Sequence, residues 1–315
     1  MLIANPIYDS VFRYLLNDKK IAKIILSTML DKEIAELEIK PTETPIPDDN
    51  MPVKYSVFRL DFAAKIKAED GTLTSVIIEM QKAKLPNDIL RFRRYIASTY
   101  QSTDNTYKVK SQKTNKNTVE KAKTIAKSRT VGIPIYPVYI LGHLLENANF
   151  PVIRVDRNYI NVATGETIKE TNEFIEGISH NALIIQLPAL KKNRRNSLEK
   201  LLTLFDPSFI TDDRHLLDIN EKDVPEKYKV VFRRLLQAAQ TPAIKKMMDQ
   251  EDEYLDSLID LEHAIAEAKQ EIAEKDITIA EKDNAIAEKD NAIAEKDKLI
   301  AEMLKKLNDT TKKNR

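Results

Sequence analysis

Apolar side chains recur every three or four residues in several stretches, a spacing typical of helices that bury one face. Near the N-terminus this pattern covers residues 7–16 and 21–29, and later in the chain it covers 198–205 and 227–240. Residues 88–101 show the same spacing and contain three arginines. We therefore predict helices over these five stretches.

Shorter runs rich in β-branched and aromatic residues predict strands. Residues 55–67 and 73–80 are two such runs, and Asp70-Gly71 between them indicates the turn of a hairpin. Further strands are predicted at 36–40, 135–141, 152–155 and 183–187. Residues 41–52 contain four prolines, which predict an extended loop there because proline restricts its own backbone and that of the preceding residue.

The last part of the chain repeats every seven residues, with IAEKDNA as a nearly verbatim unit. One heptad position is apolar throughout, at Ile265, Ile272, Ile279, Ile286, Ile293, Ile300 and Leu307. This pattern predicts one long helix. With isoleucine at position a, position d holds Lys275, Lys282, Lys289 and Lys296. Such a seam buries about half the apolar area of an ordinary zipper, so a weakly associating coiled coil and a solvated spacer are both open interpretations.

The length of 315 residues suggests about two domains. Charge is distributed unevenly along the chain. The net charge is +1, but residues 249–307 hold 18 acids and 8 bases and so carry −10. Residues 308–315 add +2, which leaves +9 on residues 1–248. Residues 102–130 contain eight bases and two acids and are predicted to form a basic loop. We predict a basic domain over 1–248, which favours a polyanionic partner, and an acidic helical tail over 249–315.

Scarce residue types exclude several kinds of site. None of the five glycines lies in a dinucleotide-binding or P-loop motif. The absence of cysteine excludes disulfides, Cys-ligated zinc, iron–sulfur clusters and thiol nucleophiles. The four histidines are scattered, so any metal would be held by oxygen ligands. No run approaches the roughly 18 apolar residues of a membrane span, and we expect a soluble, cytoplasmic protein with no membrane partner.

Two acidic residues of the predicted hairpin are candidates for a metal site. Asp61 lies in the first strand, while Glu79 and Gln81 lie near the end of the second and share one face because side chains alternate along a strand. A hairpin can bring Asp61 beside Glu79, where the two carboxylates repel unless a divalent cation joins them. Such a cation can polarise a phosphodiester and activate water. Alternatively, the two acids are unrelated members of a highly charged chain.

Around these residues the sequence resembles a known family. RLDFAAKI at 59–66, followed by IIEMQ at 77–81, resembles the D…E-x-Q core of the PD-(D/E)XK nuclease superfamily. Within that superfamily the resemblance is to Rpn-type recombination-promoting nucleases, which are also described as transposases. Other similar segments follow in order: DSVFRYLL at 9–16, the series Arg91, Tyr95, Ala97 and Tyr100, YPVYIL at 136–141, and IIQLP at 184–188. Ala97 departs from the serine usual in that family, and the similar segments span about residues 5–260.

The resemblance implies an α/β fold in which a restriction-endonuclease-like mixed sheet is flanked by helices and followed by the heptad-repeat helix. It also implies a DNA endonuclease that hydrolyses phosphodiester bonds with Mg²⁺ or another divalent cation. Asp61 and Glu79 would hold the metal, and Gln81 stands where most of the superfamily has lysine, so it could orient water or phosphate without supplying charge. Asp9 could supply a further catalytic acid from the first helix, or it could simply pair with Arg13 one turn later.

DNA contacts are implied as well. Arg91, Arg93 and Arg94 would contact phosphates beside the site, or they would form ion pairs along their helix. Residues 102–130 would be a DNA arm or a solvated loop. Because Gln81 replaces lysine, an alternative for the whole chain is a catalytically weak or inactive relative. That relative would act as a DNA-binding or oligomeric interaction module, and a homo-oligomer through the C-terminal helix is compatible with either function.

Overall fold

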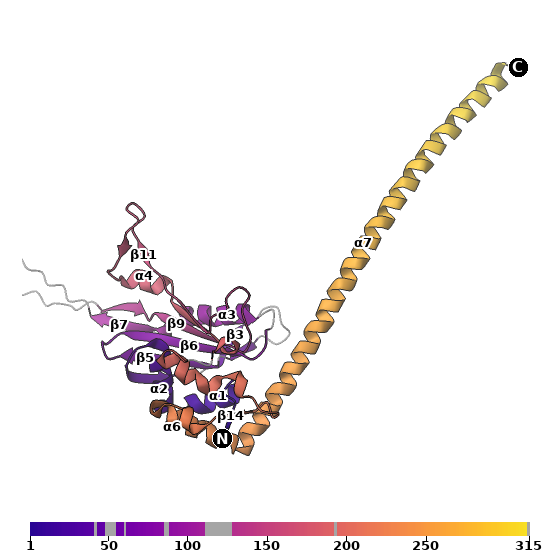
Figure 1. Cartoon of the computed structure of the whole chain (residues 1–315). Helices are drawn as coiled ribbons and strands as arrows, with labels where there is room; N and C mark the ends of the chain where they lie inside the picture. Colours follow the sequence, from indigo (N-terminus) through magenta and orange to yellow (C-terminus); the bar gives the residue numbers. More distant parts are fainter. Residues whose placement is uncertain are drawn as a thin grey trace, which may run out of the picture. The chain divides into compact units, whose positions relative to one another are not determined.

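A computed structural model of the chain describes residues 1–40, 43–47, 55–59, 61–84, 88–110, 128–191 and 194–313. The chain divides into a compact unit, Met1–Asp252, and a second unit, Glu253–Arg315. The compact unit is mixed α/β and is built around a six-stranded sheet (Figure 1). It ends four residues after the boundary predicted at residue 248.

The central sheet is mixed, with the strand order β10-β13-β9-β6-β5-β2. Its strands are β2 (Ile34–Ile39), β5 (Phe62–Ala68), β6 (Leu73–Gln81), β9 (Ile135–Leu141), β10 (Val152–Val155) and β13 (Ala182–Gln186). The predicted hairpin is present as β5 and β6, which pair antiparallel with Phe62 opposite Ile78. β9 then pairs parallel with β6 on one side and with β13 on the other.

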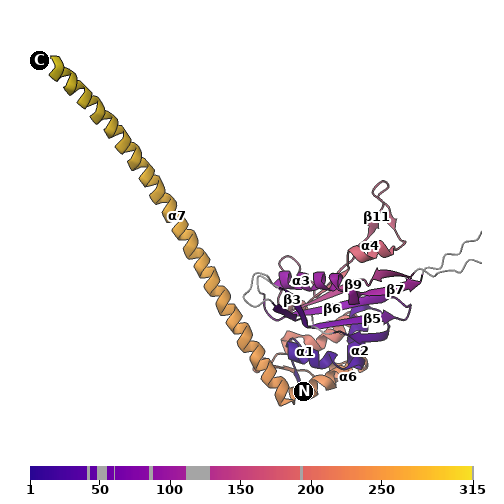
Figure 2. The ribbon, with the colours of Figure 1, turned by 180° about the vertical axis from the view of Figure 1, so that it is seen from behind.

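Helices cover both faces of this sheet (Figures 1 and 2). One face packs against α1 (Asp9–Leu16) and α2 (Lys19–Leu30), and α6 (Lys229–Ala239) joins the same core. The other face packs against α3 (Asp88–Gln101), where Ala63 and Ile77 contact the buried side chains of Phe92 and Tyr95. Because side chains alternate along β6, Glu79 lies on the same face as Ile77, toward α3.

Several elements coincide with those that the sequence pattern predicts. The helix predicted at 88–101 and the strands predicted at 135–141 and 152–155 have those bounds. The start of α2 is fixed by Asp18, whose Oδ1 accepts hydrogen bonds from the backbone N–H groups of Lys20 and Ile21. The helix predicted at 198–205 is shorter, since α5 (Ser197–Leu201) continues only as a 3₁₀ turn.

The run 55–67 is two strands instead of one. β4 (Tyr55–Arg59) pairs antiparallel with β3 (Glu43–Pro47), and a break at Asp61 separates β4 from β5. β3 therefore replaces part of the extended loop predicted at 41–52. Pro45 and Pro47 are compatible with this strand because a two-stranded ribbon has a free edge, where a missing N–H breaks no ladder.

The predicted basic loop at 102–130 also contains strands. β7 (Thr106–Lys110) and β8 (Ser128–Gly132) pair antiparallel, with Lys110 opposite Ser128. The alternation of polar and apolar residues in TYKVK is the signal for β7, which the high lysine content masks. Residues 111–127 lie outside the described part of the chain.

Smaller elements complete the compact unit. β1 (Leu2–Ala4) pairs with β14 (Leu216–Asp218), which joins the first residues of the chain to a segment more than 200 residues later. β11 (Tyr159–Ile160), β12 (Thr167–Ile168) and α4 (Glu173–Ile178) form an excursion between β10 and β13 (Figure 1). None of these was predicted, because each is very short or depends on a distant partner.

The heptad repeats lie within one continuous helix, α7 (Pro242–Lys313). Its first residues, as far as Asp252, belong to the compact unit, and the remainder forms the second unit. The repeated isoleucines from Ile265 to Ile300 are 44% to 59% exposed. Within the described ranges, every helix is too short or too polar to traverse a lipid bilayer.

Candidate functional site

The hairpin of β5 and β6 brings two of the predicted acidic residues together. Asp61 directly precedes β5, and the β5–β6 register places it level with Glu79 of β6. The backbone N–H of Met80 donates a hydrogen bond to Asp61 Oδ2, which turns this carboxylate toward the end of β6. Burial, together with the negative charges of Glu79 and Asp9, raises the pKa of Asp61 well above its usual value.

Asp9 is the first residue of α1 and belongs to the same group of charges. Its Oδ1 accepts a hydrogen bond from Arg13 Nε at 2.6 Å, which is the pairing along the helix that the sequence allowed. Asp9 is nevertheless close enough to Asp61 to raise the pKa of that carboxyl group by its charge and by a hydrogen bond. Both interpretations of Asp9 are therefore compatible with its position.

Glu79 interacts with the first arginine of α3. Arg91 donates from Nη2 at 2.6 Å and from Nε at 3.1 Å to Glu79 Oε1. The Glu79 side chain is 1% exposed, whereas that of Arg91 is 41% exposed. A buried carboxylate needs such a partner, because burying an unpaired charge is costly. Arg91 thus reaches from solvent into the site, while Arg93 and Arg94 are exposed on the same helix.

Gln81 is the last residue of β6 and lies on the same face as Glu79. Its side chain is 5% exposed, and its Nε2 has no hydrogen-bond acceptor among the described residues. A buried donor without an acceptor costs about 1–3 kcal/mol, so this amide is suited to a ligand that supplies an oxygen atom. Gly142 lies close by: a Cβ there would stand 2.6 Å from the carbonyl oxygen of Lys82, so only glycine fits.

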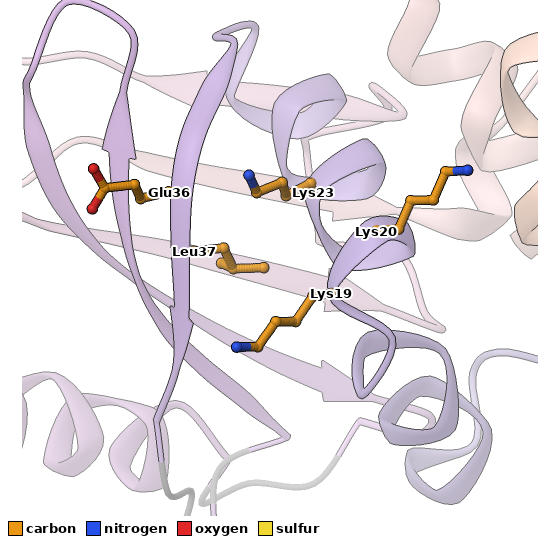
Figure 3. Close-up of a pocket in the computed structure, with 5 residues that line it drawn as sticks. All are labelled: Lys19, Lys20, Lys23, Glu36 and Leu37. Atoms are coloured by element: carbon orange, nitrogen blue, oxygen red, sulfur yellow. The ribbon is translucent and has the colours of Figure 1, made fainter.

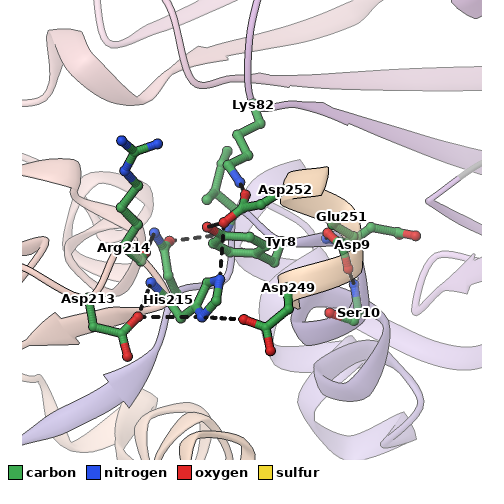
Figure 4. A network of polar contacts seen from close by, with 12 residues as sticks. Tyr8, Asp9, Ser10, Lys82, Asp213, Arg214, His215, Asp249, Glu251 and Asp252 are labelled. Atoms are coloured by element: carbon green, nitrogen blue, oxygen red, sulfur yellow. Dashed lines mark hydrogen bonds and ion pairs between the residues drawn. The ribbon is translucent and has the colours of Figure 1, made fainter. Parts of the chain in front are cut away.

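Lys82, the next residue, lies on the opposite face of the sheet and belongs to a different network (Figure 4). It forms an ion pair with Asp252 of α7, and its Nζ lies 3.7 Å from the centre of the Tyr8 ring. Asp252 Oδ2 also accepts a hydrogen bond from Tyr8 Oη at 2.9 Å and lies 3.1 Å from His215 Nε2. Burial and the hydrogen bond to Asp252 raise the pKa of Tyr8.

The same end of α7 also contacts the start of α1 (Figure 4). The carboxylate of Glu251 accepts hydrogen bonds at 2.8 Å from the backbone N–H groups of Asp9 and Ser10. These two N–H groups have no acceptor within their own helix, and the positive end of the helix dipole favours the carboxylate. Glu251 and Asp252 therefore fix the position of the helix that begins with Asp9. The sequence carries no local signal for this contact, since about 240 residues separate the partners.

A surface pocket lies elsewhere, between α2 and β2 (Figure 3). It is lined by Lys19, Lys20, Lys23, Glu36 and Leu37. Lys23 Nζ donates to the backbone oxygen of Ala35 at 2.5 Å. None of the predicted site residues lines this pocket, so it is separate from the acids of β5 and β6.

Two carboxylates, a buried amide and an arginine thus converge at one end of β5 and β6. Within the described residues, no three or more acidic or histidine side chains form a group that could hold a metal ion. No protein-family model, curated protein or solved structure matches this chain in the comparisons made.

Proposed function

We propose that the protein is a metal-dependent nuclease that hydrolyses phosphodiester bonds of DNA, of the Rpn type that its sequence resembles. The observation that carries this proposal is the convergence of Asp61, Glu79 and Gln81 at one end of the β5–β6 hairpin. A mixed sheet with helices on both faces is the architecture that the resemblance implies at the coarse level.

The donor chemistry of the site fits a divalent cation. Asp61 and Glu79 provide carboxylate oxygens. Burial and, after it, the negative charges of Glu79 and Asp9 raise the pKa of Asp61, and a cation would offset both effects. Mg²⁺ is commonly bound by one or two carboxylates, with water and substrate phosphate as its other ligands, so a third protein ligand is not required. When bound, the ion would polarise the phosphodiester and lower the pKa of a water molecule.

The remaining side chains would bind and orient the substrate. The unsatisfied Nε2 of Gln81 can donate to a phosphate oxygen or to the attacking water. Arg91 holds Glu79 in place and extends to the surface, where its guanidinium can approach a DNA phosphate. Arg93 and Arg94 are exposed on the same helix and would add sequence-independent contacts to the DNA backbone.

Plasmid nicking by the purified full-length chain tests this proposal. With Mg²⁺ the parent should relax supercoiled plasmid, and EDTA should stop the reaction. Glu79→Gln should reduce nicking by at least about 100-fold, because losing one positioned charged or polar group from such a site costs about 10²–10³ in rate. Glu38→Gln is a matched control at an exposed position and should nick like the parent. Equal nicking by Glu79→Gln and the parent would refute the site assignment.

A second readout is independent of catalysis. If Asp61 and Glu79 hold the cation, Mg²⁺ should raise the melting temperature of the parent, since a ligand that binds only the native state stabilises it. The increase should disappear in Asp61→Asn and persist in Glu38→Gln.

The Arg91–Glu79 ion pair favours one alternative function. It occupies an oxygen of a proposed ligand, as expected of an inactive relative that keeps its fold and binds DNA or another chain without cutting. In that case the parent would retard plasmid in a gel at low salt without relaxing it, and Mg²⁺ would leave its melting temperature unchanged.

A further inference from the structure

Helix α7 carries one continuous heptad frame. Leu258 and Leu261 occupy positions a and d near its beginning, and Ile300 and Met303 occupy the same positions near its end. In between, position a is always isoleucine and position d changes to lysine in four successive heptads. The apolar positions from Leu261 to Met303 are 44% to 64% exposed. These side chains form a long, exposed apolar column along one side of the helix.

Most lysines at position d of the repeat have no acidic partner along the helix, although Lys275, the first of them, pairs with Glu271 one turn earlier at 2.5 Å. In the unit at 279–285, Lys282 lies directly between Glu281 and Asp283, so its acidic neighbours are one residue away. Pairing along a helix requires a spacing of three or four residues. Those spacings from Lys282 lead to uncharged residues in both directions, and the same holds for Lys289 and Lys296. The lysines at position d of these three units therefore give this helix no support as an isolated element.

The same charges form two columns beside the isoleucines. At the 3.5 residues per turn of a coiled coil, residues three and four positions after an isoleucine lie about 50° to either side of it. Lysine occupies the first of these positions and aspartate the second, as in Lys282 and Asp283 after Ile279. The isoleucine column is thus bordered by lysine on one side and by aspartate on the other.

From this pattern we propose that α7 pairs in parallel and in register with α7 of a second copy of the chain, along the isoleucine column. A parallel two-fold pair places the lysine column of each helix against the aspartate column of the other, on both sides of the seam. The facing residues are offset by one position, about 1.5 Å along the axis, which ion pairing accommodates. An antiparallel pair would instead place lysine against lysine and aspartate against aspartate. Pairing of this kind involves the tail alone and does not depend on nuclease activity.

Orientation is tested with single cysteines, since the full-length chain has none of its own. Ile272→Cys should form a disulfide-linked dimer under mild oxidation, because position a faces its own copy in a parallel pair. A mixture of Ile272→Cys with Ile300→Cys should give homodimers of each variant without the mixed product. Mixed dimers in place of homodimers would show antiparallel pairing and overturn the proposal.

The charge pattern is tested in the full chain by light scattering, with circular dichroism to verify that the helix persists. Replacing Lys275, Lys282, Lys289 and Lys296 with glutamate should reduce the mass from two chains to one. Replacing Asp276, Asp283, Asp290 and Asp297 with lysine should do the same, and an equimolar mixture of the two variants should restore a dimer. A monomeric parent, or a dimer that both sets of substitutions leave intact, would overturn the proposal.

Discussion

At the scale of single residues, Asp61 is the side chain whose ionisation the fold opposes. Burial comes first, followed by the charges of Glu79 and Asp9, while the hydrogen bond from Met80 acts in the other direction. A carboxyl group with a raised pKa in the native state stabilises the protein at low pH, and that contribution is lost as the pH rises through the raised value. The native state therefore carries an electrostatic cost at neutral pH that a bound cation would remove.

Asp61→Asn should raise the melting temperature at neutral pH without added metal, while abolishing any nicking. The amide keeps an oxygen that can accept from the Met80 N–H, but it removes the cost of burying a charge and the repulsion from Glu79 and Asp9. The gain should amount to a few °C and should disappear as the pH falls below the ordinary aspartate pKa of about 3.9, where the parent is also neutral. Calorimetry across this pH range measures it. A variant less stable than the parent at neutral pH would contradict the assigned sign.

At the scale of elements, the first residues of α7 connect several segments of the compact unit, to which they belong. Asp252 interacts with Lys82, Tyr8 and His215, and Glu251 accepts hydrogen bonds from the first N–H groups of α1. Burial would raise the pKa of Asp252, but the hydrogen bonds from Lys82 and Tyr8 outweigh burial and lower it. A lowered carboxyl pKa gives stability that is present above the ordinary value and is lost as the pH falls through the lowered one.

Asp252→Asn should therefore destabilise the compact unit at neutral pH by about 1 kcal/mol, a discounted value because the carboxylate is partly exposed. The difference from the parent should shrink in acid, as the carboxyl group of the parent becomes protonated. Urea unfolding at neutral and acidic pH measures both quantities. Asp260→Asn, on the exposed part of α7, is the control and should change stability little. Equal stability of Asp252→Asn and the parent at neutral pH would show that the contacts of this carboxylate do not stabilise the compact unit.

Sequence patterns predicted the elements whose signals are local. The amphipathic run of α3 and the β-branched run of β9 fix their own bounds, and the alternation along β6 places Glu79 and Gln81 on one face. The break at Asp61 was missed, because β4 departs to pair with β3 and no local residue signals that choice.

Long-range contacts of the candidate site were also beyond prediction. Arg91 was expected to contact DNA or to pair along its helix, yet it binds Glu79 on a neighbouring strand. Glu251 was assigned to the tail because its composition belongs there, but it caps α1. Both contacts arise from tertiary packing, which brings together residues that no sequence period connects.

At the scale of the whole molecule, the basic charge of residues 1–248 is partly carried by the segment between β7 and β8. Residues 111–127 contain five lysines and one glutamate. The residues that flank this segment are neighbours, because Lys110 and Ser128 pair directly in the ribbon. The segment can therefore be replaced by a two-residue Asn-Gly turn without separating the strands.

That replacement should make DNA binding less salt-dependent if the segment binds phosphates. The slope of log affinity against log salt should become shallower by about 0.9 for each phosphate that the lysines of the segment neutralise. Filter binding over a range of salt concentrations measures the slope. An uncharged linker of the original length separates charge from length and should behave like the short turn. An unchanged slope would show that the segment does not bind DNA phosphates, as expected of a solvated loop.

The regularity of α7 has a consequence for how its gene changes. Where the codons repeat as the residues do, polymerase slippage at the tandem DNA would add or remove whole copies of the heptad. Each copy preserves the reading frame, leaves every isoleucine in its column and changes the helix by about 10 Å. Gain or loss of whole copies thus changes the length of the tail in steps of seven residues. The lysine and aspartate columns keep their places beside the isoleucines at every length.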